Sequence, residues 1–445
     1  MKTPIYDFVK SYADSGVSRF HMPGHKGNGP LGCEALDITE IKGADVLCEA
    51  EGIIGESENN ASRLFGTAHS FYSTEGSTLA IKAMLAIVCA DTPCAERPLI
   101  LAARNVHKAF LCAAALLDID IEWIYPEDFV HITTCHIDAA ALDSAIKRAG
   151  RVPQAVYITS PDYLGQTADI AALAEVCHAN SLPLLVDNAH GAYLAFDTPC
   201  SHPIALGADM CCDSAHKTLP VLTGGAYLHI SKNAEPEYLS RAREAMSLFA
   251  STSPSYLILQ SLDLCNDYLE NNFKDELSVC KARVAAIKER IASFGFSLLE
   301  SEPLKIVVNA AASGYTGDEL AELLRARGIE CEFADGEFLV LMASPKNTEA
   351  DFERLERAFE NIAPKAALHE SNDLLERAER KLSVREAVFV AKETVSVDDA
   401  FGRICAELAI SCPPAVPVAV CGEVITDNTV ALLKKYGVEK IKVVK

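Results

Sequence analysis

The chain has 445 residues, of which 49% are hydrophobic and 23% are charged, and this balance excludes a globally disordered protein. Its 62 acidic and 40 basic residues give a formal net charge of −22. That charge argues against binding to nucleic acids or anionic membranes. It mildly favours a cationic small molecule, although solubility alone also accounts for it.

Targeting and redox features of the sequence predict a cytoplasmic protein. The first residues, Met1–Gly16, carry charges and lack the apolar core of a signal peptide. No stretch of 18 uncharged apolar residues occurs, so we expect no membrane span. The 16 cysteines are scattered without a CxxC pair. Such a set is typical of buried free thiols in a reducing compartment.

Short apolar runs alternate with helical patterns between residues 60 and 230. Stretches such as Leu79–Ala90 and Ile170–Ala179 have helical spacing and separate runs of strand length. This alternation predicts an α/β fold with a mainly parallel sheet. The predicted strands are Leu99–Ala102, Ile121–Tyr125, Ala155–Thr159, Leu184–Asp187, Met210–Asp213 and Ala226–Ile230.

A small α+β domain is predicted to follow, and a charged linker leads from it to a proline-rich C-terminal unit. Thr316 and Glu319 have the spacing of a capping box, and Thr348 is a candidate N-cap. The predicted elements are strands Lys305–Asn309, Glu330–Phe333 and Phe338–Ala343 and helices Asp318–Arg327 and Glu349–Ile362, before the prolines Pro413, Pro414 and Pro417.

The strongest local motif is the segment from Asp213 to Thr218, which contains Lys217. It follows a predicted strand, and the carboxyl ends of parallel strands form the ligand crevice of open α/β sheets. Partial burial there lowers the pKa of a lysine and makes it a nucleophilic amine. Ser214 and His216 could donate to a phosphate. A solvated loop lysine is the plain alternative.

A second motif places Asp187 at the end of another predicted strand, followed by Asn188, Ala189, His190 and Gly191. Pyridoxal 5′-phosphate (PLP) needs an acidic partner for its pyridine nitrogen, and a lysine and an aspartate at neighbouring strand ends meet that need. Ala189 would let a ring approach closely, and His190 could orient the ring or Asp187. An ordinary helix N-cap is the alternative for this aspartate.

Three further strand ends fit the same crevice. Gly76, Ser77 and Thr78 open the predicted helix that follows Ser73, and a helix N-terminus binds phosphate well. His107 follows the strand at Leu99 and could stack on a cofactor ring. Ser160 follows the strand at Ala155 and could reach the ring hydroxyl. Each residue alone would be read as structural, so the prediction depends on their common position.

Two other patterns do not indicate sites. Residues 27–32 match GxGxxG, but no strand precedes them and Pro30 removes a backbone donor, which argues against a dinucleotide site. His21 and His25 have i,i+4 spacing, but Pro23 and Gly24 between them argue against a helix. We therefore expect no metal site there.

The sequence resembles the Orn/Lys/Arg decarboxylase family, in its compact branch of aspartate-aminotransferase-fold (fold type I) PLP enzymes. The resemblance spans almost the whole chain. It depends on FHMPGHKG at 20–27, DNAHGA at 187–192, SAHKTLP at 214–220, LSVREA at 382–387, PPAVP at 413–417 and GEVI at 422–425.

This resemblance implies four parts: an N-terminal segment contributing to the active site (1–60), a PLP-binding major domain (61–262), a small α+β domain (263–364) and the family C-terminal α+β domain (365–445). It implies at least a homodimer with active sites at the interface. Lys217 would form the Schiff base, Asp187 would hold the pyridine nitrogen and His107 would stack on the ring. The phosphate would be held by Gly76, Ser77, Ser214 and His216, and the HMPGHK residues His21, His25 and Lys26 would help build the site.

The implied reaction is decarboxylation of arginine, lysine or ornithine to agmatine, cadaverine or putrescine, with a slight preference for arginine. Lys217 or His216 is a candidate for returning the proton to Cα. Candidate acceptors for the distal cation of the substrate are Asp45, Glu49, Glu51 and Glu423, with Glu423 first.

Four residues depart from the family pattern, and two other functions stay open. Glu75, Asp162, Ala415 and Cys421 replace residues common in the family, which leaves the substrate more open than the cofactor. An aminotransferase or aldolase-type PLP enzyme would share Lys217 and Asp187. A catalytically silent homologue could act as a binding or regulatory partner.

Overall fold

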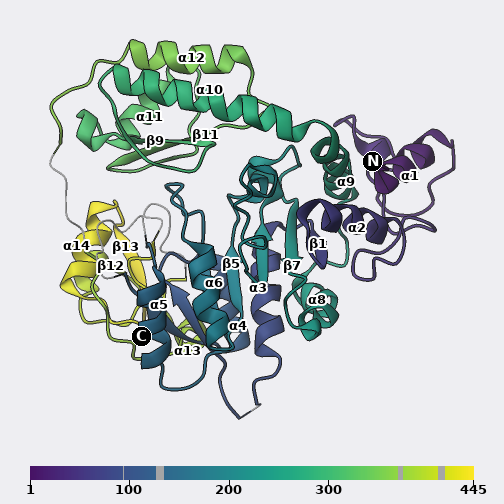
Figure 1. The fold of residues 1–445 in the computed structure, drawn as a ribbon. Helices are drawn as coiled ribbons and strands as arrows, with labels where there is room; N and C mark the ends of the chain where they lie inside the picture. Colours follow the sequence, from purple (N-terminus) through teal and green to yellow (C-terminus); the bar gives the residue numbers. More distant parts are fainter. Residues whose placement is uncertain (94, 127–134, 369–373, 409–415) are drawn as a thin grey trace. The chain divides into compact units, whose positions relative to one another are not determined.

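The computed structural model describes residues 1–93, 95–126, 135–368, 374–408 and 416–445 (Figure 1). Pro413, Pro414 and Ala415 therefore lie outside the described residues. The chain divides into two compact units, 1–91 with 177–275 and 92–176 with 276–445.

The first unit holds the amino-terminal helices and half of the large sheet. Its elements are α1 (Pro4–Asp14), α2 (Ile53–Phe65), β1 (His69–Ser73), α3 (Gly76–Cys89), β5 (Leu184–Asp187), β6 (Met210–Asp213), α7 (Ala215–Thr218), β7 (Ala226–Ile230), α8 (Pro236–Phe249) and α9 (Tyr256–Asn271), with 3₁₀ helices at Glu34–Leu36 and Ala192–Phe196.

The second unit holds the other sheet strands and the C-terminal half of the chain. Its elements are β2 (Leu99–Ala103), α4 (Lys108–Leu117), β3 (Asp120–Ile124), α5 (Ala139–Arg148), β4 (Ala155–Thr159), β8 (Ser297–Leu299), β9 (Lys305–Asn309), α11 (Gly317–Arg325), β10 (Phe333–Ala334), β11 (Phe338–Met342), α12 (Glu349–Glu360), α13 (Val384–Phe389), β12 (Lys392–Ser396), α14 (Asp427–Lys435) and β13 (Lys440–Val444), with 3₁₀ helices at Ala311–Ser313 and Val397–Asp399; α6 (Ile170–Ala179) and α10 (Phe273–Ser293) cross between the units.

The large sheet has seven strands in the order β1-β7-β6-β5-β4-β2-β3. Pairing is parallel for β2 with β3, β2 with β4 and β5 with β6, and antiparallel for β7 with both β6 and β1. Strands β2, β5, β6 and β7 are buried along their whole length. Continuous apolar runs in such strands are typical of a sheet that is covered on both faces.

The sheet confirms the predicted mainly parallel α/β fold, and β4 to β7 have the predicted bounds. Helix α3 begins at Gly76 instead of Leu79, so Gly76, Ser77 and Thr78 form its first turn. The prediction of a strand at Glu330–Phe333 was wrong, since β10 covers Phe333 and Ala334 only. Glu330 instead lies in the connection between α11 and β10, where its carboxylate accepts from Arg325 Nε at 2.8 Å.

The small domain has a four-stranded antiparallel sheet in the order β10-β11-β9-β8. Both predicted helix starts are confirmed, because Thr316 with Glu319 and Thr348 with Asp351 form capping boxes. In the C-terminal part, β12 and β13 pair antiparallel.

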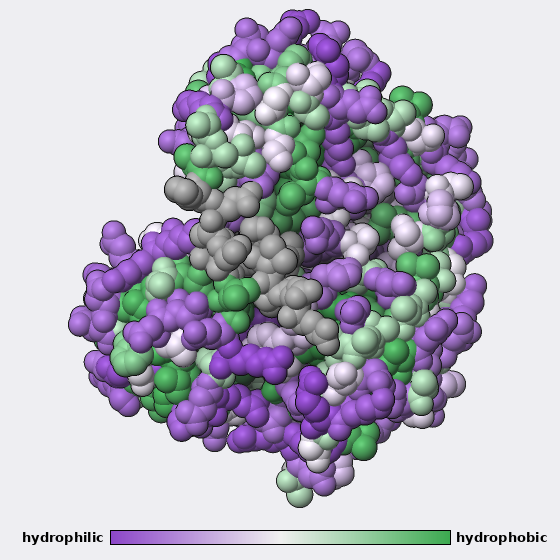
Figure 2. All heavy atoms as spheres, turned by 60° about the vertical axis from the view of Figure 1, so that its left-hand side comes forward, coloured by the Kyte–Doolittle hydropathy of each residue, from purple (hydrophilic) through white to green (hydrophobic). Residues whose placement is uncertain are grey.

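No helix among the described residues is long and apolar enough to cross a membrane. On the face drawn in Figure 2, hydrophilic residues cover most of the surface and apolar residues form smaller patches between them.

Candidate active site

The carboxyl ends of the neighbouring strands β5 and β6 bring Lys217 into contact with His190. Strand β5 ends at Asp187 and leads into the turn that carries His190, while β6 ends at Asp213 and leads into α7, which carries Lys217. The Lys217 Nζ atom lies 3.0 Å from the Nε2 atom of His190. Two motifs that the sequence places 27 residues apart therefore meet at one point.

Asp187 is buried at the end of β5, with 2% of its surface exposed. Its Oδ1 atom accepts hydrogen bonds from the Ala189 N–H (3.2 Å) and from the Cys212 thiol (3.5 Å). Ala189 is also buried and has only a methyl side chain. A carboxylate in such a setting is suited to hold a protonated ring nitrogen.

The first turn of α3 contributes to the site together with the ends of β5 and β6. Gly76 has φ +70°, and a Cβ built there would meet nothing within 4 Å, so this backbone has open space in front of it. The hydroxyl of Ser214, which follows β6, donates to the hydroxyl of Ser77 at 2.8 Å. Thr78 completes this turn, and the first amides of a helix have no partner within it.

Glu75, a departure from the family pattern, does not place a free carboxylate in this turn. Its Oε1 atom accepts a hydrogen bond from the Ser251 N–H at 2.6 Å. The carboxylate is therefore bound to the backbone that follows α8.

The ring of His216 has a defined hydrogen-bonding arrangement. Its Nδ1 atom lies 3.0 Å from the Gly225 carbonyl oxygen and so carries a hydrogen. In a neutral ring the Nε2 atom is then the acceptor nitrogen. Thr218, next to Lys217, is buried, and its hydroxyl has no hydrogen-bond partner among the described residues.

These residues fit PLP. The open space at Gly76, the paired hydroxyls of Ser77 and Ser214, and the helix N-terminus suit a phosphate. Lys217 suits the aldehyde and Asp187 the ring nitrogen. All of them lie at or just after the end of a strand, the common position from which the set was predicted.

The second unit carries the two other predicted ring contacts. His107 is the N-cap of α4, and its Nδ1 atom accepts from the Ala109 N–H at 3.2 Å, which leaves the proton of a neutral ring on Nε2. Ser160 is buried, and its Oγ atom accepts from the Ala168 N–H at 3.0 Å. The stacking role of His107 and the ring-oxygen role of Ser160 stay predictions.

The predicted N-terminal site residues have partners close to them in the sequence. His21 Nε2 lies 2.6 Å from the Tyr12 hydroxyl, His25 Nε2 lies 3.1 Å from Asp37 Oδ2, and the Lys26 amine donates to the His21 carbonyl. The neighbouring Phe20 is 96% exposed. The substrate roles of His21, His25 and Lys26 stay predictions.

Glu423, the first-ranked candidate for the substrate cation, is buried in an ion pair. Arg104, directly after β2, donates to both of its carboxylate oxygens, at 2.5 and 2.7 Å. Glu423 Oε2 also accepts from the Val420 N–H at 2.8 Å. A substrate would have to displace Arg104. Arg104 was not among the predicted site residues, although an arginine that ends an apolar strand is a signal for a buried acidic partner.

Two further departures from the family pattern are buried. Burial raises the pKa of the Asp162 carboxyl to about 6, although its Oδ1 atom accepts from the Gln166 N–H. Burial also raises the pKa of the Cys421 thiol to about 12. Cys421 is thus an inert thiol at neutral pH.

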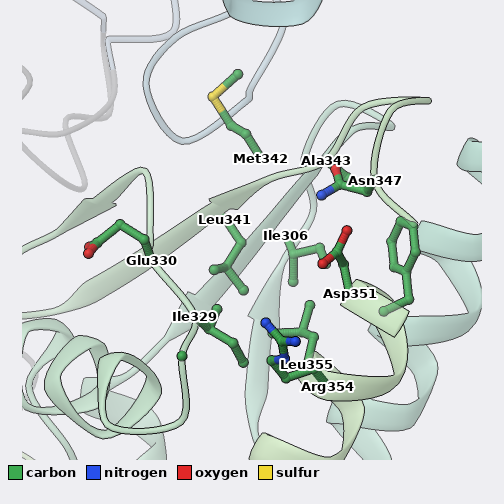
Figure 3. Close-up of a pocket in the computed structure, with 12 residues that line it drawn as sticks. Ile306, Ile329, Glu330, Leu341, Met342, Ala343, Asn347, Asp351, Arg354 and Leu355 are labelled. Atoms are coloured by element: carbon green, nitrogen blue, oxygen red, sulfur yellow. The ribbon is translucent and has the colours of Figure 1, made fainter. Parts of the chain in front are cut away.

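The small domain contains a pocket of about 190 Å³ (Figure 3). It is lined by residues of β9, β11 and α12 and contains none of the predicted site residues. Its carboxylates are engaged, because Glu330 binds Arg325 and Asp351 caps α12. It offers no nucleophile and is not the candidate active site.

Known proteins resemble this chain over nearly its whole length. Protein YaaO of Bacillus subtilis (strain 168), described as uncharacterized, is 29% identical over 98% of this chain and 94% of its own length. The arginine decarboxylase of the same strain is 27% identical over 98% of this chain and 93% of its own length. The lysine decarboxylase LdcF of Francisella novicida has a similar fold, with a TM-score of 0.81 at 17% identity, covering 100% of this chain and 81% of that one.

Two family models match the chain. Residues 3–310 match the Orn/Lys/Arg decarboxylase major domain, and residues 370–436 match the Orn/Lys/Arg decarboxylase C-terminal domain. The chain therefore belongs to the Orn/Lys/Arg decarboxylase family, a family of PLP-dependent amino acid decarboxylases.

Proposed function

We propose that this chain decarboxylates L-arginine to agmatine and CO₂, using PLP held by Lys217 and Asp187. The observation that carries the proposal is the contact between Lys217 and His190, 3.0 Å apart, beside the buried carboxylate of Asp187. Arginine is chosen over lysine and ornithine because relatives that match nearly the whole chain are named arginine decarboxylases.

When bound, PLP supplies an electron sink for the pair of electrons left on Cα after CO₂ departs. Asp187 would keep the ring nitrogen protonated, because a buried carboxylate stabilises a nearby positive charge strongly. Its own geometry is fixed by the Ala189 N–H and the Cys212 thiol. The side chain therefore needs little rearrangement to take this role.

Lys217 and His190 would exchange a proton with each other. Lys217 is the amine that would hold the cofactor covalently and that the amino group of the substrate would replace. The released Lys217 amine lies within hydrogen-bonding distance of His190 Nε2. His190 can therefore orient this amine and exchange a proton with it, which makes Lys217 a candidate to protonate Cα.

Phosphate binding would come from the first turn of α3, from Ser77 and Ser214, and from His216. The Gly225 carbonyl accepts from His216 Nδ1, so Nε2 would donate to the phosphate from the doubly protonated ring. His107 would stack on the ring, and the Ser160 hydroxyl would donate to the ring oxygen. The roles of His107 and of the phosphate ligands come from the family resemblance, and that of Ser160 comes from its position after β4.

A second copy of the chain would complete the site. The segment with His21 and His25 has apolar side chains in solvent, with Phe20 96% and Met22 56% exposed. Covering them removes apolar surface from water. We therefore propose a homodimer in which this segment is buried at the interface, as the family resemblance implies.

Product analysis tests the function. The purified protein is incubated with PLP and, in separate reactions, with arginine, lysine or ornithine, and the amines are identified by mass spectrometry. Agmatine as the dominant product supports the proposal. Cadaverine as the dominant product would show that the substrate is lysine, and putrescine would show that it is ornithine. A keto acid without any amine would show that the reaction is transamination and not decarboxylation. The Lys217→Ala variant is the control for each reaction.

A further inference from the structure

A buried carboxylate, Asp213, lies behind the two turns that carry the proposed PLP ligands. Its Oδ2 atom accepts from the Nε2 atoms of His202 (3.0 Å) and His229 (3.1 Å). All three side chains are at most 1% exposed. The antiparallel pairing of β6 with β7 brings His229 to this position, and Ser70 Oγ contacts its Nδ1 atom at 2.8 Å.

The other oxygen of Asp213 connects to the β5 turn. The Asn188 side-chain amide donates to Asp213 Oδ1 at 2.7 Å, and the Asn188 N–H donates to the Cys212 carbonyl at 3.0 Å. Asn188 directly follows Asp187 and precedes His190 by two positions. Its side chain and backbone thus bind the β5 turn to β6.

Asp213 also begins the turn that carries Lys217. The next residue, Ser214, donates its hydroxyl to Ser77, and the Lys217 N–H donates to the Ser214 carbonyl at 3.0 Å. The Asp213 side chain therefore joins the end of β6 to the turn after β5. The ligands for the aldehyde, the ring nitrogen and the phosphate all come from these two turns and from α3.

The partners of Asp213 keep it ionised. Burial alone would raise the pKa of its carboxyl, but the nearby His202 and His229 hold the pKa well below its usual range. A charged acceptor makes stronger hydrogen bonds than a neutral one, especially where water is excluded. The network therefore consists of charge-assisted hydrogen bonds in a buried setting.

We infer that Asp213 is a positioning residue that acts through Asn188 to fix the turn of Asp187 and His190 relative to Lys217. The inference deepens the proposed function and rests on it. It predicts that breaking the Asp213–Asn188 bond weakens PLP binding and changes the orientation of the bound ring, without removing any residue that touches the cofactor.

The test measures PLP binding instead of activity. Dissociation constants and the induced circular dichroism per bound cofactor are compared for the wild type, Asp213→Asn and Asn188→Ala. We expect each variant to bind PLP about tenfold more weakly, because a lost hydrogen bond to a buried charge changes an equilibrium constant by about this factor. We also expect a reduced dichroism signal. If Asp213→Asn does not fold, Asn188→Ala decides the question.

Asp209→Asn is the matched control. Asp209, just before the other end of β6, accepts from His178 Nε2 (3.1 Å) and from the Leu184 N–H (2.8 Å). The Asp209→Asn variant should have a lower Tm than the wild type but a PLP dissociation constant within twofold of the wild-type value. The inference is overturned if Asn188→Ala binds PLP less than threefold more weakly than the wild type, or if Asp209→Asn weakens binding equally. A wild-type protein that binds no PLP would instead overturn the proposed function.

Discussion

Arg104 and Glu423 form a bidentate ion pair that joins residues 319 positions apart in the chain. Their side chains are 1% and 4% exposed, and the Arg104 guanidinium lies 4.8 Å from the centre of the Trp123 ring. The Pro417 carbonyl also accepts from Arg104 Nε at 3.3 Å. The pair therefore fixes the 417–423 segment to the end of β2, close in sequence to His107.

Removing one charge of this ion pair should destabilise the protein more than removing both charges. Glu423→Gln leaves the Arg104 charge buried without its counter-ion, which typically costs about 3–5 kcal/mol. The double variant Arg104→Met with Glu423→Leu removes both charges and should recover most of the loss. Thermal unfolding of the three proteins measures this order. A double variant less stable than Glu423→Gln would contradict it.

The same variants separate a structural from a substrate-binding role of Glu423. If the Glu423 carboxylate binds only Arg104 and not the substrate, the double variant should keep the KM for arginine within about threefold of the wild type. If it binds the substrate cation, both variants should raise KM at least tenfold. Glu330→Gln, which breaks an exposed pair with Arg325, is the control and should cost less than about 1 kcal/mol.

Lys217→Ala should abolish turnover, because Lys217 is the amine proposed to hold the cofactor and lies in contact with His190. We expect a loss of at least about 10⁴-fold, the size seen when a catalytic nucleophile is removed. The visible absorbance of lysine-bound cofactor should disappear as well. Lys232→Ala, which removes an exposed lysine after β7, should keep both signals. Substantial residual activity in Lys217→Ala would refute the assignment.

Asp187→Asn should leave the protein folded and still able to hold PLP through Lys217, but it should lower kcat. An amide cannot keep the ring nitrogen protonated, and the loss of one fixed electrostatic partner costs about 10²–10³-fold in rate. Single-turnover decarboxylation and cofactor absorbance measure the two effects separately. A normal rate with Asn at this position would show that Asp187 does not face the ring nitrogen.

The strand ends of the site could be predicted because the sequence shows them locally. Apolar runs of strand length stop at Asp187 and Asp213, and parallel strands place such ends at one edge of a sheet. Helix starts were equally local, as the Thr316 capping box shows. The common position of Lys217 and His190 just after these ends was predicted, whereas their contact became visible only in the structure.

The supporting contacts could not be predicted because their partners are distant in the sequence. His229 reaches Asp213 only through the antiparallel register of β6 and β7, and Glu423 reaches Arg104 across most of the chain. Neither pairing has a local pattern. Glu423 illustrates the consequence: an acidic residue in a family motif suggested substrate binding, whereas its buried partner became visible only in the fold.

Asp263 gives the stability of the protein a pH dependence with a defined sign. Its carboxylate accepts from the N–H groups of Ile5 and Tyr6 at the start of α1, at 2.9 and 3.0 Å, and from the Ser57 hydroxyl. Burial nevertheless raises the pKa of this carboxyl to about 6. The folded protein therefore binds this proton more tightly than the unfolded chain, in which an aspartate has a pKa of about 3.9.

The stabilisation from Asp263 is thus fully present below about pH 3.9 and is lost as the pH rises through about 6. A shift of about two units corresponds to at most about 3 kcal/mol. We expect Tm of the wild type minus Tm of Asp263→Asn to fall between pH 4.5 and 7.5. Asp351→Asn is the control: the Asp351 pKa is lowered by the Thr348 N–H, so its Tm difference should stay constant over this range. A wild-type advantage over Asp263→Asn that grows with pH would reverse the sign and show that the hydrogen bonds to Ile5 and Tyr6 outweigh burial.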